Sequence, residues 1–215
     1  MSKTPWTRLW LDYRKVNSKG NEVFAESVAI DGFDSTPIIK NALQELCMGV
    51  REMISVETII RENGNEAALY IVKDTALSTE LPGTYRIKET DGKLILSAGE
   101  ETGVLYGVFH ILRMLATEQS LQGMDMTQIP SQPLRMYNHW DNMDGSIERG
   151  YSGRSFFYKN NEFTTGERTR DYARFLASVG INGVVINNVI VKDAATYLIT
   201  ERYFDKVQEL YELFS

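Results

Sequence analysis

The sequence predicts an α/β protein in which an N-terminal α+β domain precedes a second part of alternating strands and helices. Residues 1–117 mix short β-rich segments with two amphipathic helices, which is typical of a small mixed sheet covered by helices. Residues 118–133 are polar, contain two of the five prolines and are expected to be a linker. Residues 134–215 alternate strand, loop and helix, as parallel strands with crossover helices do.

The first expected elements are two strands and a helix. Residues 6–13 (WTRLWLDY) and 24–30 (FAESVAI) are β-rich, with imperfect alternation. Thr36 is placed to cap a helix that begins at Pro37, because Pro fits the first helical turn. Cys47 lies beside the apolar stripe of this helix and is expected to be a packed thiol. The stripe consists of Ile39, Leu43, Leu46, Val50 and Met53.

A strand, a hairpin and a second helix are expected next. Residues 68–74 form the strand, and residues 83–99 the hairpin, because two β-rich runs flank Asp91-Gly92, a favoured type I′ turn pair. The helix covers residues 100–117. His110 lies one position off its apolar face and is expected to be neutral and packed or half-exposed. That face consists of Val104, Val108, Ile111, Leu112 and Leu115.

The second part contains two predicted strand–helix units. Residues 134–138 and 181–189 are the strands, and the second of them has the β-branched composition of a strand buried on both faces. The helices are expected over residues 166–180, where Gly180 is placed to end the helix, and over residues 200–214. Their apolar faces consist of Tyr172, Phe175, Leu176 and Val179 in the first helix and of Phe204, Val207, Tyr211 and Phe214 in the second.

Alternating strands and helices of this kind open a (β/α)8 barrel, which takes about 250 residues. Residues 134–215 are therefore expected to supply its first one or two βα units, in a truncated form, which suggests a fragment of a longer protein. The alternative is a self-sufficient small α/β domain, but two parallel strands without further partners would leave exposed edges.

Composition limits the function classes. The chain is 43% hydrophobic and carries a formal net charge of −6, spread along its length. This is not the basic footprint of a nucleic-acid-binding protein, and it offers no attraction to an anionic membrane. The N-terminus lacks a signal-peptide core, no apolar run is long enough for a membrane helix, and Cys47 is the single cysteine. We expect a cytoplasmic protein with no nucleic-acid or membrane partner.

Candidate functional residues follow the two predicted strands, at the edge where α/β proteins gather their sites. A Trp beside amides, carboxylates and an Arg suits a carbohydrate, because a pyranose stacks on the indole while its hydroxyls pair with the polar groups. Arg149 is also able to bind a substrate carboxylate bidentately. The residues are Asn138, His139, Trp140, Asp141, Asn142, Asp144, Glu148, Arg149 and Tyr151 after the first strand, and Asn187 and Asn188 after the second.

The same residues have structural alternatives. Asp141 and Asp144 are able to cap turns, Glu148 and Arg149 to form a solvated pair, and Trp140 to fill a barrel mouth. Asparagines at a strand end, such as residues 187 and 188, are often turn residues. A metal site is not expected, because the spacing fits neither an EF-hand nor a zinc motif. The side chains considered for it are His139, Asp141, Asp144 and Glu148.

Two long segments resemble glycoside hydrolase family 67, the α-glucuronidases. RMYNHWDNMDGSIERGYSGRSFF (135–157) and YARFLASVGINGVVINNV (172–189) are similar to the start of the family's catalytic domain. GTYRIKETDGKLILSAGEETGVLYGVFHILRML (83–115) resembles the family's N-terminal domain, a kind of α/β domain that also precedes the barrel in β-hexosaminidases. The resemblance covers essentially the whole chain.

This resemblance implies a cytoplasmic enzyme that removes α-1,2-linked 4-O-methylglucuronic acid from xylooligosaccharides, without a cofactor and often as a homodimer. Hydrolysis would proceed with inversion, which requires a general acid and a general base about 6.5–9.5 Å apart. The family's catalytic carboxylates are expected beyond Ser215, so no catalytic residue is assigned in this chain and the fragment is expected to be inactive. A non-catalytic carbohydrate-binding module and an assembly domain remain alternatives.

The resemblance also implies a set of substrate-binding residues. The matching segments are the family's first two βα loops, which shape the pocket for the uronic acid. Contacts or pocket scaffolding are therefore expected from Trp140, Asp141, Glu148, Arg149, Asn187 and Asn188. Ile190 departs from the family pattern, in which an Asn is expected, and this puts a polar contact just past Asn188 in doubt.

Overall fold

A computed structural model describes residues 11–187, 191 and 193–215 as a mixed α/β fold. By its internal contacts the chain divides into two units, one formed by Asp12–Pro133 and the other containing Leu134–Ser215. Among the described residues, no helix is both long and apolar enough to cross a membrane.

The Asp12–Pro133 unit is built on a six-stranded mixed sheet. The strand order is β2-β1-β3-β5-β4-β6. β2, β1, β3 and β5 run parallel to one another, whereas β4 is antiparallel to both of its neighbours. The strands are β1 (Ser27–Asp31), β2 (Ile59–Arg61), β3 (Leu69–Lys73), β4 (Tyr85–Thr90), β5 (Lys93–Ala98) and β6 (Asp125–Gln128).

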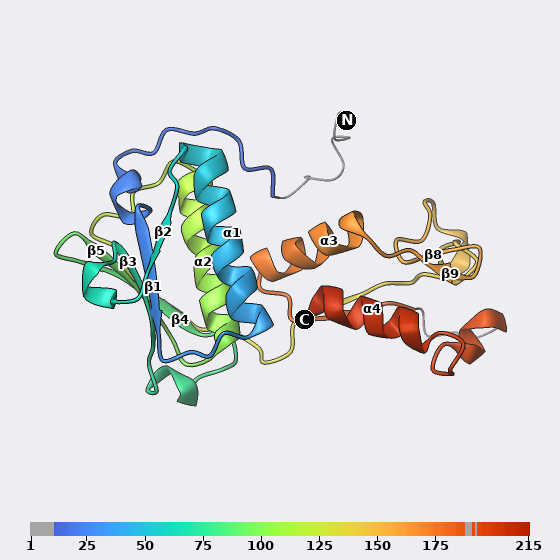
Figure 1. The fold of residues 1–215 in the computed structure, drawn as a ribbon. Coiled ribbons are helices and arrows are strands. Elements are labelled where there is room, and N and C mark those ends of the chain that lie inside the picture. The colour runs from blue at the N-terminus through green and yellow to red at the C-terminus, as the bar shows by residue number, and fades with distance from the viewer. Residues whose placement is uncertain (1–10, 188–190, 192) are drawn as a thin grey trace. The chain divides into compact units, whose positions relative to one another are not determined.

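Two long helices, α1 (Pro37–Ile54) and α2 (Glu101–Ala116), lie side by side against one face of this sheet (Figure 1). The hydroxyl of Thr36 caps α1 by accepting from the N–H of Ile39 at 3.4 Å, as predicted. The predicted apolar face of α2 is entirely buried. A Cβ on Gly107 would lie 2.3 Å from the Leu96 side chain, so this glycine lets α2 approach β5 closely.

The side chains of Cys47 and His110 are both packed in this unit. Cys47 is half-buried on α1, where burial raises the pKa of its thiol. His110 on α2 is also half-buried, with its Nδ1 2.8 Å from the hydroxyl of Tyr85. Burial lowers the pKa of His110, and the nearby Arg113 charge acts in the same direction, so the ring is neutral. Both observations agree with the packed side chains predicted from the sequence.

The hairpin of β4 and β5 is confirmed together with its turn. Asp91 and Gly92 both have positive φ angles, 52° and 77°, as a type I′ turn requires. The right-handed twist of the two strands matches this turn, which explains why an Asp-Gly pair joins them.

Three details of this unit differ from the expectations. Residues 6–10 lie outside the described residues, and 11–13 form no strand. β2 was not predicted. β6 lies within residues 118–133, the expected linker, and pairs with β4, where Arg86 contacts the carboxylate of Asp125 bidentately. Both strands are short, exposed edge strands, so they lack the apolar alternation that marks a half-buried strand.

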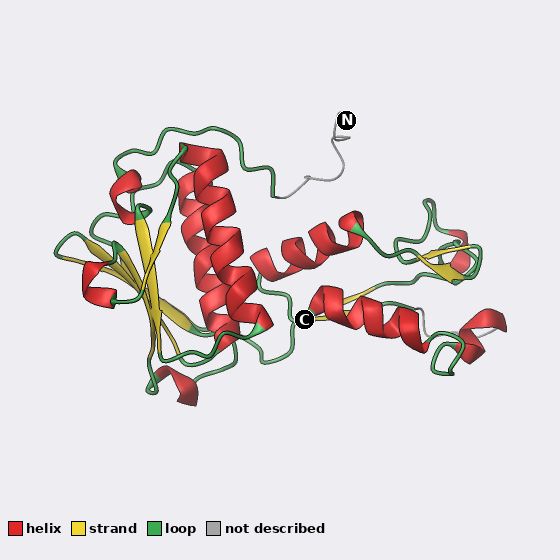
Figure 2. Cartoon of the chain, in the orientation of Figure 1, coloured by secondary structure: helices red, strands yellow, loops and turns green. Residues whose placement is uncertain are grey.

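The described part of Leu134–Ser215 contains short strands, long loops, short 3₁₀ turns and the α-helices α3 and α4 (Figure 2). β7 pairs in parallel with β10, and α3 lies between these two strands in the sequence. The core of this unit is largely aromatic and consists of Met143, Phe157, Tyr158, Phe163, Tyr203 and Leu210. The elements are β7 (Met136–Asn138), β8 (Tyr158–Lys159), β9 (Glu162–Phe163), α3 (Glu167–Ser178), β10 (Gly183–Val185) and α4 (Phe204–Phe214).

The buried face of α4 differs from the expected one. Phe204 and Tyr211, which the sequence predicts on its apolar face, are 55% and 67% exposed. Leu210 is buried instead, and Phe214 packs against the aromatic core. The apolar residues of α4 extend around more of the helix than the rest of Leu134–Ser215 covers, so the period alone could not select the face that packs.

Candidate functional site

The candidate site lies at the carboxyl edge of the two parallel strands. Asn138, the last residue of β7, pairs with Val185, the last residue of β10. The N–H of His139 donates to the carbonyl of Val185 at 2.9 Å, so the strands stay together one residue further. The loop that follows β7 and the Asn187 that follows β10 therefore leave from the same edge, as the sequence predicted.

Asp141 anchors the loop from inside. Its side chain is buried, and Oδ2 accepts hydrogen bonds from the hydroxyl of Ser155 (2.5 Å) and from the N–H groups of Phe156 (2.6 Å) and Phe157 (3.3 Å). These donors lie 14 to 16 residues further along the chain. One carboxylate thus ties the outgoing and returning ends of the loop together with charge-assisted hydrogen bonds.

The surroundings of Asp141 keep it charged. Burial acts to raise the pKa of its carboxyl, but the contacts with His139, Ser155 and the N–H groups of Phe156 and Phe157 outweigh burial and lower it. A general acid in glycoside hydrolysis needs a raised pKa. The geometry of Asp141 is therefore that of a scaffold, one of the two readings that the sequence left open.

His139 lies between Asp141 and α3. Its Nδ1 is 3.6 Å from Oδ1 of Asp141, and its Nε2 is 2.8 Å from the hydroxyl of Tyr172. The rings of Phe156 and Phe157 also surround the imidazole, which is 12% exposed. The sequence does not predict a role for Tyr172 or Ser155 in this site, because both lie far from His139 and Asp141 along the chain.

Trp140, Arg149 and Tyr151 form an exposed group, which we term the aromatic corner. Trp140 and Tyr151 are 42% and 59% exposed. Their ring centroids lie 6.1 Å apart, and the ring planes are inclined by 48°. The guanidinium carbon of Arg149 lies 5.9 Å from the centroid of the Trp140 ring, within cation–π range. The corner brings together Trp140 and Arg149, which the sequence predicts as substrate-binding residues, and Tyr151, which it does not.

The backbone returns Arg149 to Trp140. The N–H of Glu148 donates to the carbonyl of Trp140 at 2.9 Å, so the two ends of this stretch are joined. Arg149 then has a left-handed backbone (φ 58°, ψ 21°), and Gly150 follows with φ 69°. A non-glycine residue in this region is strained by about 1–3 kcal/mol, and such strain is often found at ligand-binding loops.

Two further carboxylates of the loop have different environments. Asp144 accepts from the N–H (2.8 Å) and the hydroxyl (2.6 Å) of Ser146, which is the turn-capping role considered for it. Glu148 is half-buried, and no ion pair joins it to Arg149 in the described structure. The solvated Glu148–Arg149 pair considered from the sequence is therefore not what the structure contains.

Asn187 is half-buried, and its Oδ1 is a buried acceptor without a hydrogen-bond partner among the described residues. Such an acceptor is costly unless something donates to it. Asn188, its predicted companion, lies outside the described residues, as does Ile190. Within the described part of the chain, no group of three or more His, Cys, Asp or Glu side chains is arranged to hold a metal ion.

Comparisons with known proteins agree with an α/β carbohydrate-active chain. The sequence profile described as glycosyl hydrolase family 67 N-terminus matches residues 9–111, and the profile of the family 67 middle domain matches residues 114–215. These matches define the class as glycoside hydrolase. Because the two profiles together account for nearly the whole chain, the chain belongs to glycosyl hydrolase family 67.

Curated relatives are longer than this chain. A probable α-glucuronidase A of Aspergillus terreus is 32% identical over 223 residues, covering 95% of this chain and 26% of the relative. The α-glucuronidase A of Aspergillus tubingensis is 40% identical over 115 residues, covering 53% of this chain and 13% of the relative. The chain thus spans about a quarter or less of these relatives.

A solved structure has a similar fold. It is a family GH115 4-O-methyl-α-glucuronidase with specificity for decorated arabinogalactans, and it superposes with a TM-score of 0.58. The match covers 87% of this chain and 27% of that chain at 14% sequence identity, so the likeness concerns the fold alone.

Proposed function

We propose that this chain is part of an inverting α-glucuronidase that hydrolyses α-1,2-linked (4-O-methyl)glucuronic acid from xylooligosaccharides. Its membership of family 67 and the names of its relatives support a glucuronidase. The observation that carries the proposal at the level of residues is the aromatic corner, because it joins a stacking surface to a cation at the carboxyl edge of parallel strands.

Leu134–Ser215 is proposed to be the start of a (β/α)8 barrel. Support comes from the parallel β7–β10 pair with a helix between the strands, which is the repeating unit of that fold. Support also comes from Met136 and Val185, which are 53% and 41% exposed although they lie on strands. In a complete barrel, further strands and helices would cover such residues.

The size of the aromatic corner decides how a sugar binds there. A pyranose sandwiched between two rings needs van der Waals contact of about 3.5–4 Å on each side, hence ring centroids more than about 7 Å apart. The 6.1 Å between Trp140 and Tyr151 is too small. We therefore propose that the sugar stacks on one face of Trp140, with the Tyr151 ring beside it as a second wall.

Arg149 supplies the charge for a uronic acid. Its guanidinium has only the cation–π contact with Trp140 in the described structure, so its fork of N–H donors is available to a carboxylate. Glu148 and Asn187 are proposed to receive sugar hydroxyls, since the Oδ1 of Asn187 is a buried acceptor without a partner among the described residues. Asn188 remains a proposed contact from the sequence.

The general acid and base are proposed to lie outside this chain. Of the loop carboxylates, Asp141 is buried and holds three donors, and Asp144 holds both donors of Ser146. Neither environment is that of a carboxyl that exchanges protons with a substrate. Residues 1–215 alone are accordingly proposed to bind the sugar weakly and to catalyse nothing.

The test compares two substrates in the complete enzyme: a xylooligosaccharide carrying 4-O-methylglucuronic acid, and its analogue with the carboxyl reduced to an alcohol. Arg149→Gln should lower kcat/KM for the acid about 10- to 100-fold, the loss of a charge-assisted pair, and leave the reduced analogue nearly unchanged. Trp140→Ala should lower both. Ile60→Ala, which removes an exposed apolar side chain of β2 in the other unit, is the control. Equal losses on both substrates for Arg149→Gln would refute the assigned role.

A further inference from the structure

A chain of side-chain contacts runs beneath the aromatic corner. It begins at the hydroxyl of Tyr172 on α3, continues through both nitrogens of His139 after β7, and ends at the carboxylate of Asp141, whose other oxygen holds Ser155. All four side chains are buried or half-buried. The chain therefore links the helix, the strand end and the returning end of the loop.

The alternating direction of side chains along the backbone connects these contacts to Trp140, the exposed residue between His139 and Asp141. Successive side chains of an extended segment point to opposite sides. The His139 and Asp141 side chains are 12% and 4% exposed, whereas Trp140 between them is 42% exposed. Tethering both neighbours on the inner side therefore fixes the direction in which Trp140 points outward.

One arrangement of protons satisfies all the contacts of Tyr172, His139 and Asp141. The charged carboxylate of Asp141 favours a proton on Nδ1 of His139, which leaves Nε2 to accept from the hydroxyl of Tyr172. Burial raises the pKa of Tyr172 to about 12, with the nearby Tyr137 and Asp141 acting in the same direction. The phenol is therefore protonated, and its O–H donates a hydrogen bond to Nε2 of His139.

We propose that His139 is a positioning residue, which couples α3 to the loop through Tyr172 and Asp141 and thereby sets where Trp140 and Arg149 meet the substrate. This inference rests on the proposed function, and it adds that substrate affinity depends on a residue that touches no substrate. The contact it makes with Tyr172 is the distinctive part, because a packing role alone would not need the hydroxyl.

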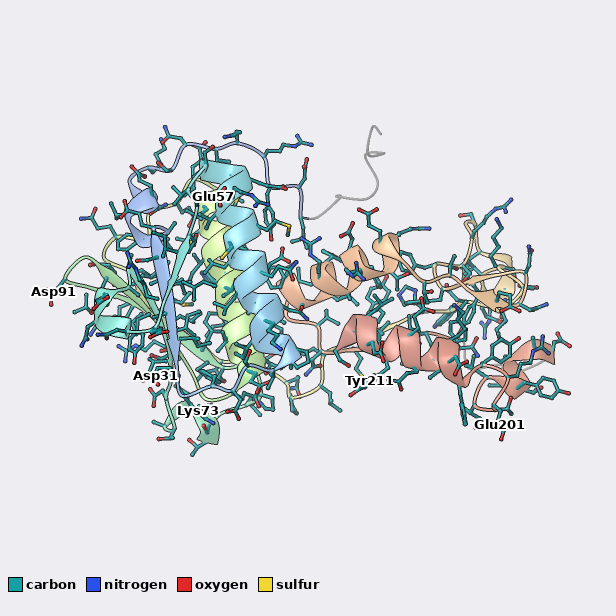
Figure 3. The ribbon with its side chains drawn as sticks, in the orientation of Figure 1. Asp31, Glu57, Lys73, Asp91, Glu201 and Tyr211 are labelled. Atoms are coloured by element: carbon teal, nitrogen blue, oxygen red, sulfur yellow. The ribbon has the colours of Figure 1, made fainter. Side chains whose placement is uncertain are left out.

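The experiment uses three variants of the complete enzyme: Tyr172→Phe, His139→Asn and the double variant. Phe keeps the ring contacts with Phe156 and Phe157 and removes only the hydroxyl. Asn is long enough to stay near Asp141 and too short to reach Tyr172. Tyr211→Phe on α4, where Tyr211 is exposed (Figure 3), is the matched control and should change nothing.

Either single variant should raise the KM for the glucuronic acid-bearing substrate about 3- to 10-fold, because it removes one hydrogen bond. The kcat should stay within about twofold of the wild type. The double variant should be no worse than His139→Asn, because the hydroxyl acts only through the imidazole. Additive losses in the double variant, or a fall of kcat with unchanged KM, would overturn the proposal.

A second readout separates this inference from the proposed function. Amide hydrogen exchange over residues 142–157 should be faster in Tyr172→Phe and His139→Asn than in the wild type, and unchanged in Tyr211→Phe, whatever the enzyme hydrolyses. If the wild type releases no glucuronic acid, the proposed function fails while this readout still tests the coupling. Unchanged exchange in Tyr172→Phe, His139→Asn and the double variant, with thermal unfolding as in the wild type, would reject the coupling itself.

Discussion

At the scale of single residues, the carboxylate of Asp141 stabilises the fold only while it is charged. Its pKa in the folded chain is lowered, so its contribution is present above the pKa of the unfolded chain, near 4, and is lost as the pH falls through the folded pKa. At neutral pH, Asp141→Asn should lower the free energy of unfolding by about 1–3 kcal/mol, because it weakens three hydrogen bonds.

Urea unfolding of the wild type and of Asp141→Asn at pH 7 and pH 3 measures this dependence. The difference between the two proteins should be largest at pH 7 and smaller at pH 3, and it should shrink further as the pH falls through the folded pKa of Asp141. Asp34→Asn, at an exposed position, is the control and should show little difference at either pH. A difference between wild type and Asp141→Asn that does not shrink on acidification would mean that the charge of Asp141 is not what holds the loop.

Single residues also show how far the sequence determines the candidate site. Trp140 and Arg149 were recognisable because an indole and a guanidinium are unusual in a glycine-rich loop, and the structure brings them together. The scaffold role of Asp141 could not be distinguished from a contact role. The donors to its Oδ2, on Ser155, Phe156 and Phe157, are 14 to 16 residues away, and backbone N–H groups carry no sequence signature. The pair of His139 and Tyr172, 33 residues apart, was hidden for the same reason.

At the scale of elements, the β4–β5 hairpin depends on the left-handed backbone of its turn. Gly92 has φ 77°, and a Cβ there would meet no atom within 4 Å, so a substitution changes the backbone energy without a clash. Gly92→Ala should therefore lower the free energy of unfolding by about 1–2 kcal/mol. Asp91→Asn should be nearly neutral, because Asn tolerates the same conformation. Thermal unfolding checks both, and an equal loss in the two variants would contradict the turn assignment.

The elements that were predicted are those with local signals. α1 has an apolar stripe within its 18 residues and a capping Thr36 directly before them, and the hairpin has a turn pair between two alternating runs. β2 and β6 have only three and four residues, and they form by pairing with β1 and β4, which lie far away along the chain. The packed face of α4 was missed because apolar residues occur on several sides of it, and only the surrounding structure selects Leu210.

At the scale of the whole molecule, the two units should differ in local stability. The six-stranded sheet with α1 and α2 buries β3 and β5 between neighbours on both sides. β7 and β10 form a sheet of two three-residue strands, which is marginal by itself. Amide exchange of the 215-residue chain should therefore be slow in β3 and β5 and much faster in β7 and β10. Equally strong protection in both sheets of a monomer would contradict the barrel-start proposal.

The main proposal is that Trp140, Arg149 and Tyr151 form one wall of a glucuronic acid pocket whose general acid and base lie outside residues 1–215. Its most direct test is proton NMR of a xylooligosaccharide carrying 4-O-methylglucuronic acid, incubated with the complete enzyme or with residues 1–215 alone. The complete enzyme should first release the β-anomer of the free sugar, the product of inversion at an α-linkage, and residues 1–215 should release none. Release by residues 1–215, or first release of the α-anomer by the complete enzyme, would contradict it.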